Sequence, residues 1–211
     1  DLMSPSNQKL LGGLMMLMCK RPKIKGQDII DFKDLLAGGT SYGNHRASVD
    51  DICALQYTGG TTGPSKGVML TQSCLTANVA QALDVISVAP ESARYSVTAL
   101  PLPLYHIYAF SLCVGVLPAL RGHSVLIPDP RNIPLLIKAI KRSKIQIFCG
   151  LNSLFVALLE NKDFRRLDFD QLKMTLSGGM PLMKSVADRW QKVTGCIVSE
   201  GYGMTESSPI I

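Results

Sequence analysis

The sequence predicts an α/β fold in which largely parallel sheets are flanked by helices. From Asp51 onward, short apolar runs alternate with segments of helical periodicity, as expected for parallel strands covered on both faces. Hydrophobic residues make up 46% of the 211 residues and charged residues 18%, so the chain can bury a core. This length corresponds to one domain or to a domain and a half.

Six short apolar runs bounded by turn residues are expected to be strands. They are Cys53 to Thr58, Tyr95 to Leu102, His123 to Ile127, Ile145 to Cys149, Lys173 to Ser177 and Cys196 to Ser199.

Three segments between these runs place apolar residues on one helical face. The first helix is expected to be capped by Thr71 or Ser73, the second to follow Asn132, and the third to stop at Gly195. The apolar faces consist of Leu75, Val79, Leu83 and Ile86; of Ile133, Leu136, Ile137 and Ile140; and of Leu182, Val186, Trp190 and Val193.

Residues 1–50 form an irregular lead-in segment. Leucines between Leu10 and Met18 fit one face of a short helix, and the basic stretch from Lys20 to Lys25 follows. This combination suits either peripheral contact with an anionic membrane or a packed helix beside a solvated loop. The apolar run Leu10 to Cys19 is too short to span a bilayer, for which ~20 residues are needed, so we expect a soluble or peripheral protein. Residues 38–46 are expected to be a loop.

Charge and cysteine usage exclude several classes of protein. The net charge of +6 suits an anionic ligand but does not require nucleic acid, and no nucleic-acid partner is expected. The six cysteines stand singly, without a C-x-x-C pair, so neither a zinc site nor a disulfide framework is expected. A reducing, cytoplasmic setting follows, with peripheral contact at the inner face of the membrane as an extension of it.

The segment Y-T-G-G-T-T-G-P-S-K-G-V, from Tyr57 to Val68, has the composition of a polyphosphate-binding loop. Its glycines allow the backbone N–H groups to face a ligand, its hydroxyls add donors, and its lysine adds a positive charge. An ordinary glycine-rich hairpin is the structural alternative. The candidate ligand-binding residues are Thr58, Gly59, Gly60, Thr61, Thr62, Gly63, Ser65 and Lys66.

A Walker-type loop is disfavoured, because it needs G-K-[ST] between a strand and a helix. Here Lys66 follows Ser65 and precedes Gly67. Residues 67–70 are expected to form a second strand, and the next helix begins only after Thr71. The loop therefore joins two strands and cannot offer a helix N-terminus to a phosphate.

Three later segments carry further candidates. His106 ends P-L-P-L-Y-H and is either a core residue or a ligand-facing imidazole. The loop S-G-G-M-P, with Gly178 and Gly179, lies between a strand and a helix, where α/β proteins bind ligands.

The third segment, E-G-Y-G-M-T-E, ends at Glu206. Gly201 and Gly203 expose Tyr202, whose ring could stack on a base. Thr205 offers a hydroxyl to a phosphate and Glu206 a hard oxygen to Mg²⁺. A tight turn with a surface glutamate is the alternative interpretation.

Together these segments resemble the adenylate-forming (AMP-binding) enzymes, which comprise acyl-CoA synthetases, luciferases and peptide-synthetase adenylation domains. The family motifs are Y-T-[SG]-G-T-T-G-x-P-K-G, P-L-[FY]-H, S-G-G-x-P and [QE]-G-Y-G-x-T-E, and all four occur here in that order between about Asp51 and the last residue. Ser65 replaces a common proline and Gln72 a frequent histidine. The segment G-L-N-S-L-F and the spelling E-G-Y-G are most similar to bacterial long-chain fatty-acid–CoA ligases.

The resemblance implies that residues 51–211 are the AMP-binding core of a large N-terminal domain. It implies that Tyr202 packs on adenine, Thr205 contacts the α-phosphate, Glu206 binds Mg²⁺ and His106 borders the carboxylate pocket. Lys66 would serve the departing pyrophosphate. ATP, Mg²⁺ and coenzyme A are the implied cofactors or co-substrates, and a long-chain fatty acid is the implied substrate. The expected catalytic residues are Thr205, Glu206, His106 and Lys66, and the ATP site adds Gly178, Gly179, Gly201, Tyr202 and Gly203 to the phosphate loop.

The implied reaction forms an acyl-adenylate and then acyl-CoA. The chain lacks a Y-R-T-G-D stretch and the family's mobile C-terminal domain. It begins at Asp1 without a methionine and stops in the apolar run Pro209-Ile210-Ile211. We therefore expect an internal fragment that is nearly inert alone. Two alternatives stay open: a non-catalytic nucleotide- or acyl-binding module, and a ligase for a medium-chain or aromatic acid.

Overall fold

The computed structural model describes residues 32–39, 43, 46–58, 64–87 and 93–211, and the chain divides into two units, 1–46 and 47–211. In the first unit, the described part contains α2 (Phe32–Gly38), a helix of seven residues that the sequence analysis did not predict. The helix expected between Leu10 and Met18 and the basic stretch after it lie outside the described residues.

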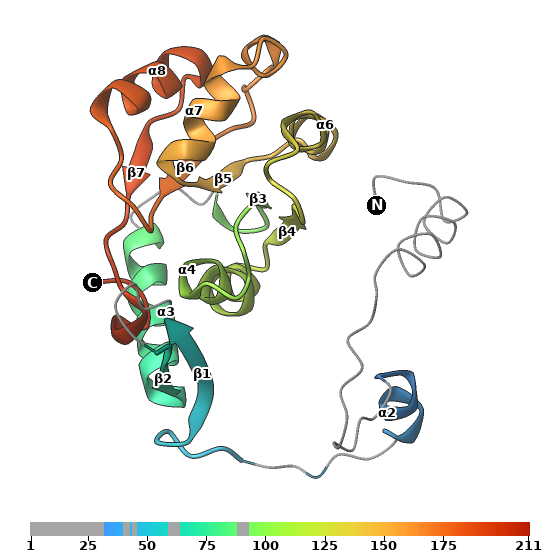
Figure 1. Cartoon of the computed structure of the whole chain (residues 1–211), viewed down its shortest axis with the longest axis vertical. Coiled ribbons are helices and arrows are strands. Elements are labelled where there is room, and N and C mark those ends of the chain that lie inside the picture. The colour runs from blue at the N-terminus through green and yellow to red at the C-terminus, as the bar shows by residue number, and fades with distance from the viewer. Residues whose placement is uncertain (1–31, 40–42, 44–45, 59–63, 88–92) are drawn as a thin grey trace. The chain divides into compact units, whose positions relative to one another are not determined.

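The second unit contains a parallel sheet of five strands in the order β4-β3-β5-β6-β7 and an antiparallel hairpin, β1-β2 (Figure 1). All six predicted strands are confirmed, and the predicted run Tyr95 to Leu102 is shortened because Tyr95 adopts a left-handed turn and Pro101 cannot extend the ladder. The strands are β1 (Ile52–Thr58), β2 (Lys66–Thr71), β3 (Val97–Leu100), β4 (His123–Leu126), β5 (Ile147–Gly150), β6 (Met174–Ser177) and β7 (Val198–Glu200).

Helices connect the strands, and the three predicted ones are confirmed. Thr71 is the cap of the first, because its hydroxyl accepts the N–H of Cys74 at 3.3 Å. The third helix begins later than expected, so Leu182 precedes it. The helical elements are α3 (Gln72–Ser87), α4 (Ile107–Ser111), the π-helix η2 (Leu112–Val116), α5 (Leu117–Ala119), α6 (Ile133–Ser143), α7 (Asn152–Glu160), η3 (Phe164–Arg166), α8 (Lys184–Thr194) and η4 (Thr205–Ser207).

The other two helix ends have the expected capping residues. Asn132 accepts the N–H of Leu135 at 3.1 Å, and Gly195 ends α8 in the left-handed conformation with φ of 73°.

The parallel sheet separates two cores, because alternate residues of each strand face opposite sides. In β5, Ile147 and Cys149 pack toward α3, α4 and η2, whereas Phe148 packs against Trp190 of α8 at a centroid distance of 5.4 Å. The indole Nε1 of Trp190 donates to the Thr175 hydroxyl of β6 at 3.0 Å, so the buried nitrogen is satisfied. Helices α3 and α4 thus cover one face, and α7 and α8 the other (Figure 1).

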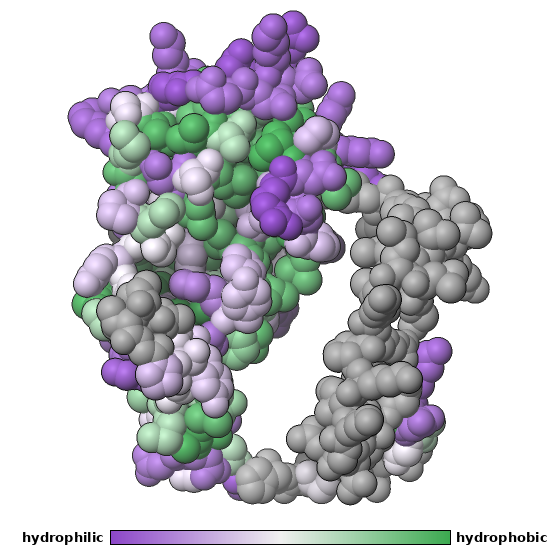
Figure 2. All heavy atoms as spheres, viewed as in Figure 1, coloured by the Kyte–Doolittle hydropathy of each residue, from purple (hydrophilic) through white to green (hydrophobic). Residues whose placement is uncertain are grey.

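The surface of the second unit is uneven in hydropathy. Hydrophilic side chains gather over the end that carries α7 and α8 (Figure 2). The β1-β2 hairpin, in contrast, exposes Ile52, Leu55, Tyr57 and Met69, so its outer face is apolar. Within the described part of the chain, no helix is both long and apolar enough to cross a membrane.

Candidate functional site

The candidate site is built at one edge of the parallel sheet. Strands β5, β6 and β7 run in the same direction and end at Gly150, Ser177 and Glu200. The chain continues from β6 into Gly178, whose N–H donates to the Gly150 carbonyl at 3.4 Å, and from β7 into Gly201, whose N–H donates to the Ser177 carbonyl at 2.8 Å. The two predicted glycine loops are therefore neighbours at the carboxyl ends of the strands, where α/β sheets bind ligands.

The predicted phosphate loop lies between two antiparallel strands, as expected. Thr58 ends β1 and Lys66 begins β2, and the Thr58 hydroxyl donates to the Lys66 carbonyl at 3.4 Å. The Lys66 side chain is exposed and forms no ion pair with any described residue. The helix starts only at Gln72, which confirms that the segment is not a Walker loop. Residues Gly59, Gly60, Thr61, Thr62 and Gly63 lie outside the described residues.

His106 is exposed at the beginning of α4 and is not a core residue. Its Nδ1 accepts the backbone N–H of Tyr108 at 3.3 Å. With Nδ1 as the acceptor, a neutral ring carries its proton on Nε2 and presents an N–H donor to whatever lies beyond it. This hydrogen bond orients the imidazole at the start of α4.

Tyr108 is a site residue that the sequence analysis missed, because it belongs to none of the four motifs. Its ring packs on Gly178, where an added Cβ would lie only 3.3 Å from the ring. Burial raises the pKa of its phenol well above the ordinary value of 10.0. Its hydroxyl interacts with the buried thiol of Cys149, whereas the Ser177 hydroxyl next to Gly178 is buried without a hydrogen-bond partner among the described residues.

The E-G-Y-G-M-T-E segment forms a closed loop after β7. Gly203 pairs with Ile210 in an antiparallel bridge, and two backbone bonds flank the pair: Met204 N to Pro209 O at 3.0 Å and Ile211 N to Tyr202 O at 3.1 Å. A Cβ on Gly203 would collide with the Pro209 carbonyl, so only glycine permits this approach. The short helix η4 forms the tip of the loop, between the two paired segments at Gly203 and Ile210.

The side chains that the sequence analysis selected from this loop are accessible. Tyr202 is 70% exposed and Glu206 is exposed at the tip, while Thr205 is half-buried at the start of η4. Among the described residues, no group of three or more His, Cys, Asp or Glu side chains could hold a metal ion together. A single unpaired carboxylate fits Mg²⁺ bound to a nucleotide, because Mg²⁺ commonly takes one or two carboxylates and completes its shell with phosphate oxygens and water.

Two contacts bring the hairpin to the other motifs. The Gln56 side chain of β1 donates to the backbone carbonyl of Tyr105, next to His106, and β2 contacts η4. The fold thus brings together four segments that are far apart in the sequence. They are the described flanks of the phosphate loop, the P-L-Y-H segment, the S-G-G loop and the E-G-Y-G loop.

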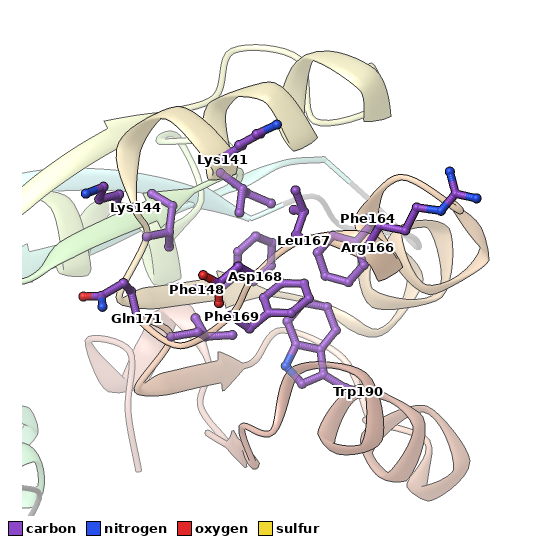
Figure 3. Close-up of a pocket in the computed structure, with 13 residues that line it drawn as sticks. Lys141, Lys144, Phe148, Phe164, Arg166, Leu167, Asp168, Phe169, Gln171 and Trp190 are labelled. Atoms are coloured by element: carbon purple, nitrogen blue, oxygen red, sulfur yellow. The ribbon is translucent and has the colours of Figure 1, made fainter.

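A pocket of about 560 Å³ lies elsewhere, at the amino ends of β5 and β6 (Figure 3). Phe148, Phe164 and Trp190, each at most 2% exposed, are among the residues that line this pocket. The guanidinium of Arg166 points away from the pocket (Figure 3). The pocket lies at the opposite end of the strands from the glycine loops and shares no residue with them. The pocket is therefore not part of the candidate site.

Comparison with known proteins agrees with the motifs, and the region of similarity extends further toward the N-terminus. Residues 15–211 match the family of AMP-binding enzymes, so the likeness begins well before Asp51. A long-chain-fatty-acid–CoA ligase of Haemophilus influenzae is 40% identical over 193 residues, which are 90% of this chain and 34% of that protein. The chain thus spans about a third of the length of this relative.

Solved structures share the fold. The inhibitor-bound N-terminal domain of FACL13 from Mycobacterium tuberculosis superposes with a TM-score of 0.71 at 20% identity, over 83% of this chain and 42% of that one. ATP-bound MatB from Rhodopseudomonas palustris superposes with a TM-score of 0.68 at 27% identity, over 84% of this chain and 34% of that one. The α/β architecture with its parallel sheet is thus that of adenylate-forming N-terminal domains. The chain belongs to the family of AMP-binding enzymes.

Proposed function

We propose that a protein of family length containing this chain activates a long-chain fatty acid with ATP and transfers the acyl group to coenzyme A. The observation that carries the proposal is the convergence of the four motifs at the carboxyl edge of the sheet. The 40% identity to a long-chain-fatty-acid–CoA ligase supports the choice of substrate. In this chemistry a carboxylate oxygen attacks the α-phosphorus, and the bond to the pyrophosphate oxygen breaks. The coenzyme A thiol then loses its proton and attacks the acyl carbon, and AMP leaves.

The first step brings one anion to another, so positioning and charge neutralisation dominate it. Lys66, the first residue of β2, would supply a positive charge to the departing pyrophosphate, and Thr58, Ser65 and the loop glycines would supply the surrounding donors. Thr205 donates its hydroxyl to the α-phosphate. Glu206 would hold Mg²⁺, which when bound neutralises charge on the phosphates.

Different segments would contact the adenine base and the fatty carboxylate. Tyr202 offers its exposed ring to adenine beside Gly201 and Gly203. His106 would face the fatty carboxylate, and Gly179, where an added Cβ would have nothing within 4 Å, would leave room for the acyl chain.

Pyrophosphate exchange in a family-length protein tests the proposal. We expect fatty-acid-dependent exchange of labelled pyrophosphate into ATP, which Thr205→Val lowers by about 100-fold or more and Thr205→Ser largely retains, because one transition-state donor is removed or kept. A panel of long-chain, medium-chain and aromatic acids identifies the substrate class. Nucleotide binding without any exchange would instead support the non-catalytic binding module.

Calorimetry on the present chain tests the base site separately. We expect Mg-ATP to bind more tightly than Mg-GTP, and Tyr202→Ala to remove that preference without unfolding the chain, because the side chain is 70% exposed. We also expect no acyl-CoA formation by the 211 residues alone. Equal binding of the two nucleotides, insensitive to Tyr202, would contradict the stacking role.

A further inference from the structure

We propose that Asn78 is a positioning residue that holds Thr205 and Glu206 in place by clamping the chain at Ile210. Asn78 lies in the middle of α3 and is 5% exposed, and it belongs to none of the motifs. The ligand in this inference, a nucleoside triphosphate with its divalent cation, rests on the proposed function.

The clamp uses the backbone groups of Ile210 that the loop leaves free. Ile210 lies opposite Gly203, and the backbone bonds on either side of this pair are donated by Met204 and Ile211. In such a pair the N–H and C=O of Ile210 point away from Gly203. There the Asn78 Nδ2 donates to the Ile210 carbonyl at 2.8 Å, and its Oδ1 accepts the Ile210 N–H at 3.2 Å. The planar side-chain amide replaces the peptide group of a neighbouring strand.

The rest of α3 fixes the orientation of this amide. The N–H and carbonyl of Ile210 distinguish the nitrogen from the oxygen of the Asn78 side chain, and the second N–H of Nδ2 donates to Gln81 Oε1 at 3.2 Å. This face of α3 therefore holds the returning segment at Ile210.

The anchoring of Ile210 also affects the two candidate ligand-binding side chains, Thr205 and Glu206, through the closed loop. Met204 is bonded to Pro209 and to the Ser207 hydroxyl, so the tip between them is closed. Thr205 and Glu206 lie at this tip, and no described residue is hydrogen-bonded to either side chain. Their positions therefore depend on where the paired segments are anchored, and Ile210 is the residue through which α3 anchors them.

Amide hydrogen exchange together with calorimetric titration of Mg-ATP on the full chain tests the clamp. Asn78→Ala leaves both Ile210 groups without a partner, and we expect exchange at Ile210, Met204 and Ile211 to accelerate by roughly 10- to 100-fold. Asn78→Asp keeps the acceptor for the N–H and loses the donor to the carbonyl, so its effect is intermediate. The affinity for Mg-ATP falls in the same order.

Asn161→Ala is the matched control, because the Asn161 side chain also accepts two backbone N–H groups, of Asp163 and Phe164, but outside the candidate site. We expect it to leave the three exchange rates and the Mg-ATP affinity unchanged. Unchanged exchange in Asn78→Ala would overturn the clamp, and accelerated exchange with unchanged affinity would overturn its positioning role. Failure of the unsubstituted chain to bind Mg-ATP would count against the proposed function, while the exchange rates would still decide the clamp.

Discussion

Replacing Gly203 by alanine should open the E-G-Y-G loop while leaving the fold intact. The added Cβ would collide with the buried Pro209 carbonyl, so the pair formed by Gly203 and Ile210 must separate. Separation breaks the two flanking backbone bonds, of 3.0 and 3.1 Å, each with a net contribution of about 1 kcal/mol. The closed loop therefore loses about 2 kcal/mol, which corresponds to a roughly 30-fold larger opening equilibrium.

Gly201→Ala is the matched control within the same motif. The nearest atom to a Cβ at Gly201 is the Ser177 carbonyl oxygen at 3.8 Å, which is ordinary contact. Hydrogen exchange at the Met204 and Ile211 amides, measured by NMR or by mass spectrometry of short peptides, reports the opening directly. We expect about 30-fold faster exchange in Gly203→Ala and at most about twofold faster exchange in Gly201→Ala. Equal acceleration in both variants, or none in Gly203→Ala, would refute the steric reasoning.

Three further predictions concern the cores and the thiols. Trp190→Ala should lower the free energy of unfolding by about 3–5 kcal/mol, because it removes a fully buried side chain and leaves a cavity. Urea titration followed by circular dichroism measures this loss, and a loss below about 1 kcal/mol would contradict the packing. Burial raises the pKa of the Cys149 thiol from 9.0 to about 12, so the folded chain keeps a proton that the unfolded chain loses. Stability should therefore be unaffected by this group below pH 9.0 and fall by on the order of 1 kcal/mol per pH unit between 9.0 and about 12, with a flatter profile in Cys149→Ala. A hydrogen bond with the Thr71 hydroxyl lowers the pKa of the exposed Cys74 thiol. Iodoacetamide at pH 7.5 should therefore label Cys74 well before Cys149, as quantified by peptide mass spectrometry. Equal labelling of the two thiols would contradict this difference in reactivity.

The strands were predictable because each carries a local signal. A short apolar run ending in a glycine or serine, as in Ile147–Gly150 and Met174–Ser177, predicts a buried strand wherever it lies in the chain. The capping residues Thr71 and Asn132 were equally local. The segment from Ile107 to Ala119 was missed as helical because it is apolar on nearly every face and contains Gly115 and Pro118, so it has no clear period.

Most candidate site residues could be identified from motifs, but their support could not. Asn78 is a buried polar residue beside the apolar face of its helix, and no spacing rule connects it to Ile210. Tyr108 likewise gains its place only when α4 packs against the S-G-G loop. Such contacts depend on the order of strands in the sheet, which the sequence pattern leaves undetermined.

The bond between Asn78 and Ile210 also constrains the order in which the protein folds. It joins residues 132 positions apart, whereas the bonds that close the loop between Tyr202 and Ile211 span fewer than ten. Loop-closure entropy increases with separation, so the small loop can form early, while its docking on α3 must await the sheet between them. On the ribosome, α3 is complete long before Ile210 is synthesised. Within residues 47–211, the candidate site is therefore expected to assemble late, and a pulse of hydrogen exchange during refolding should protect β5 and β6 before the amide of Ile210.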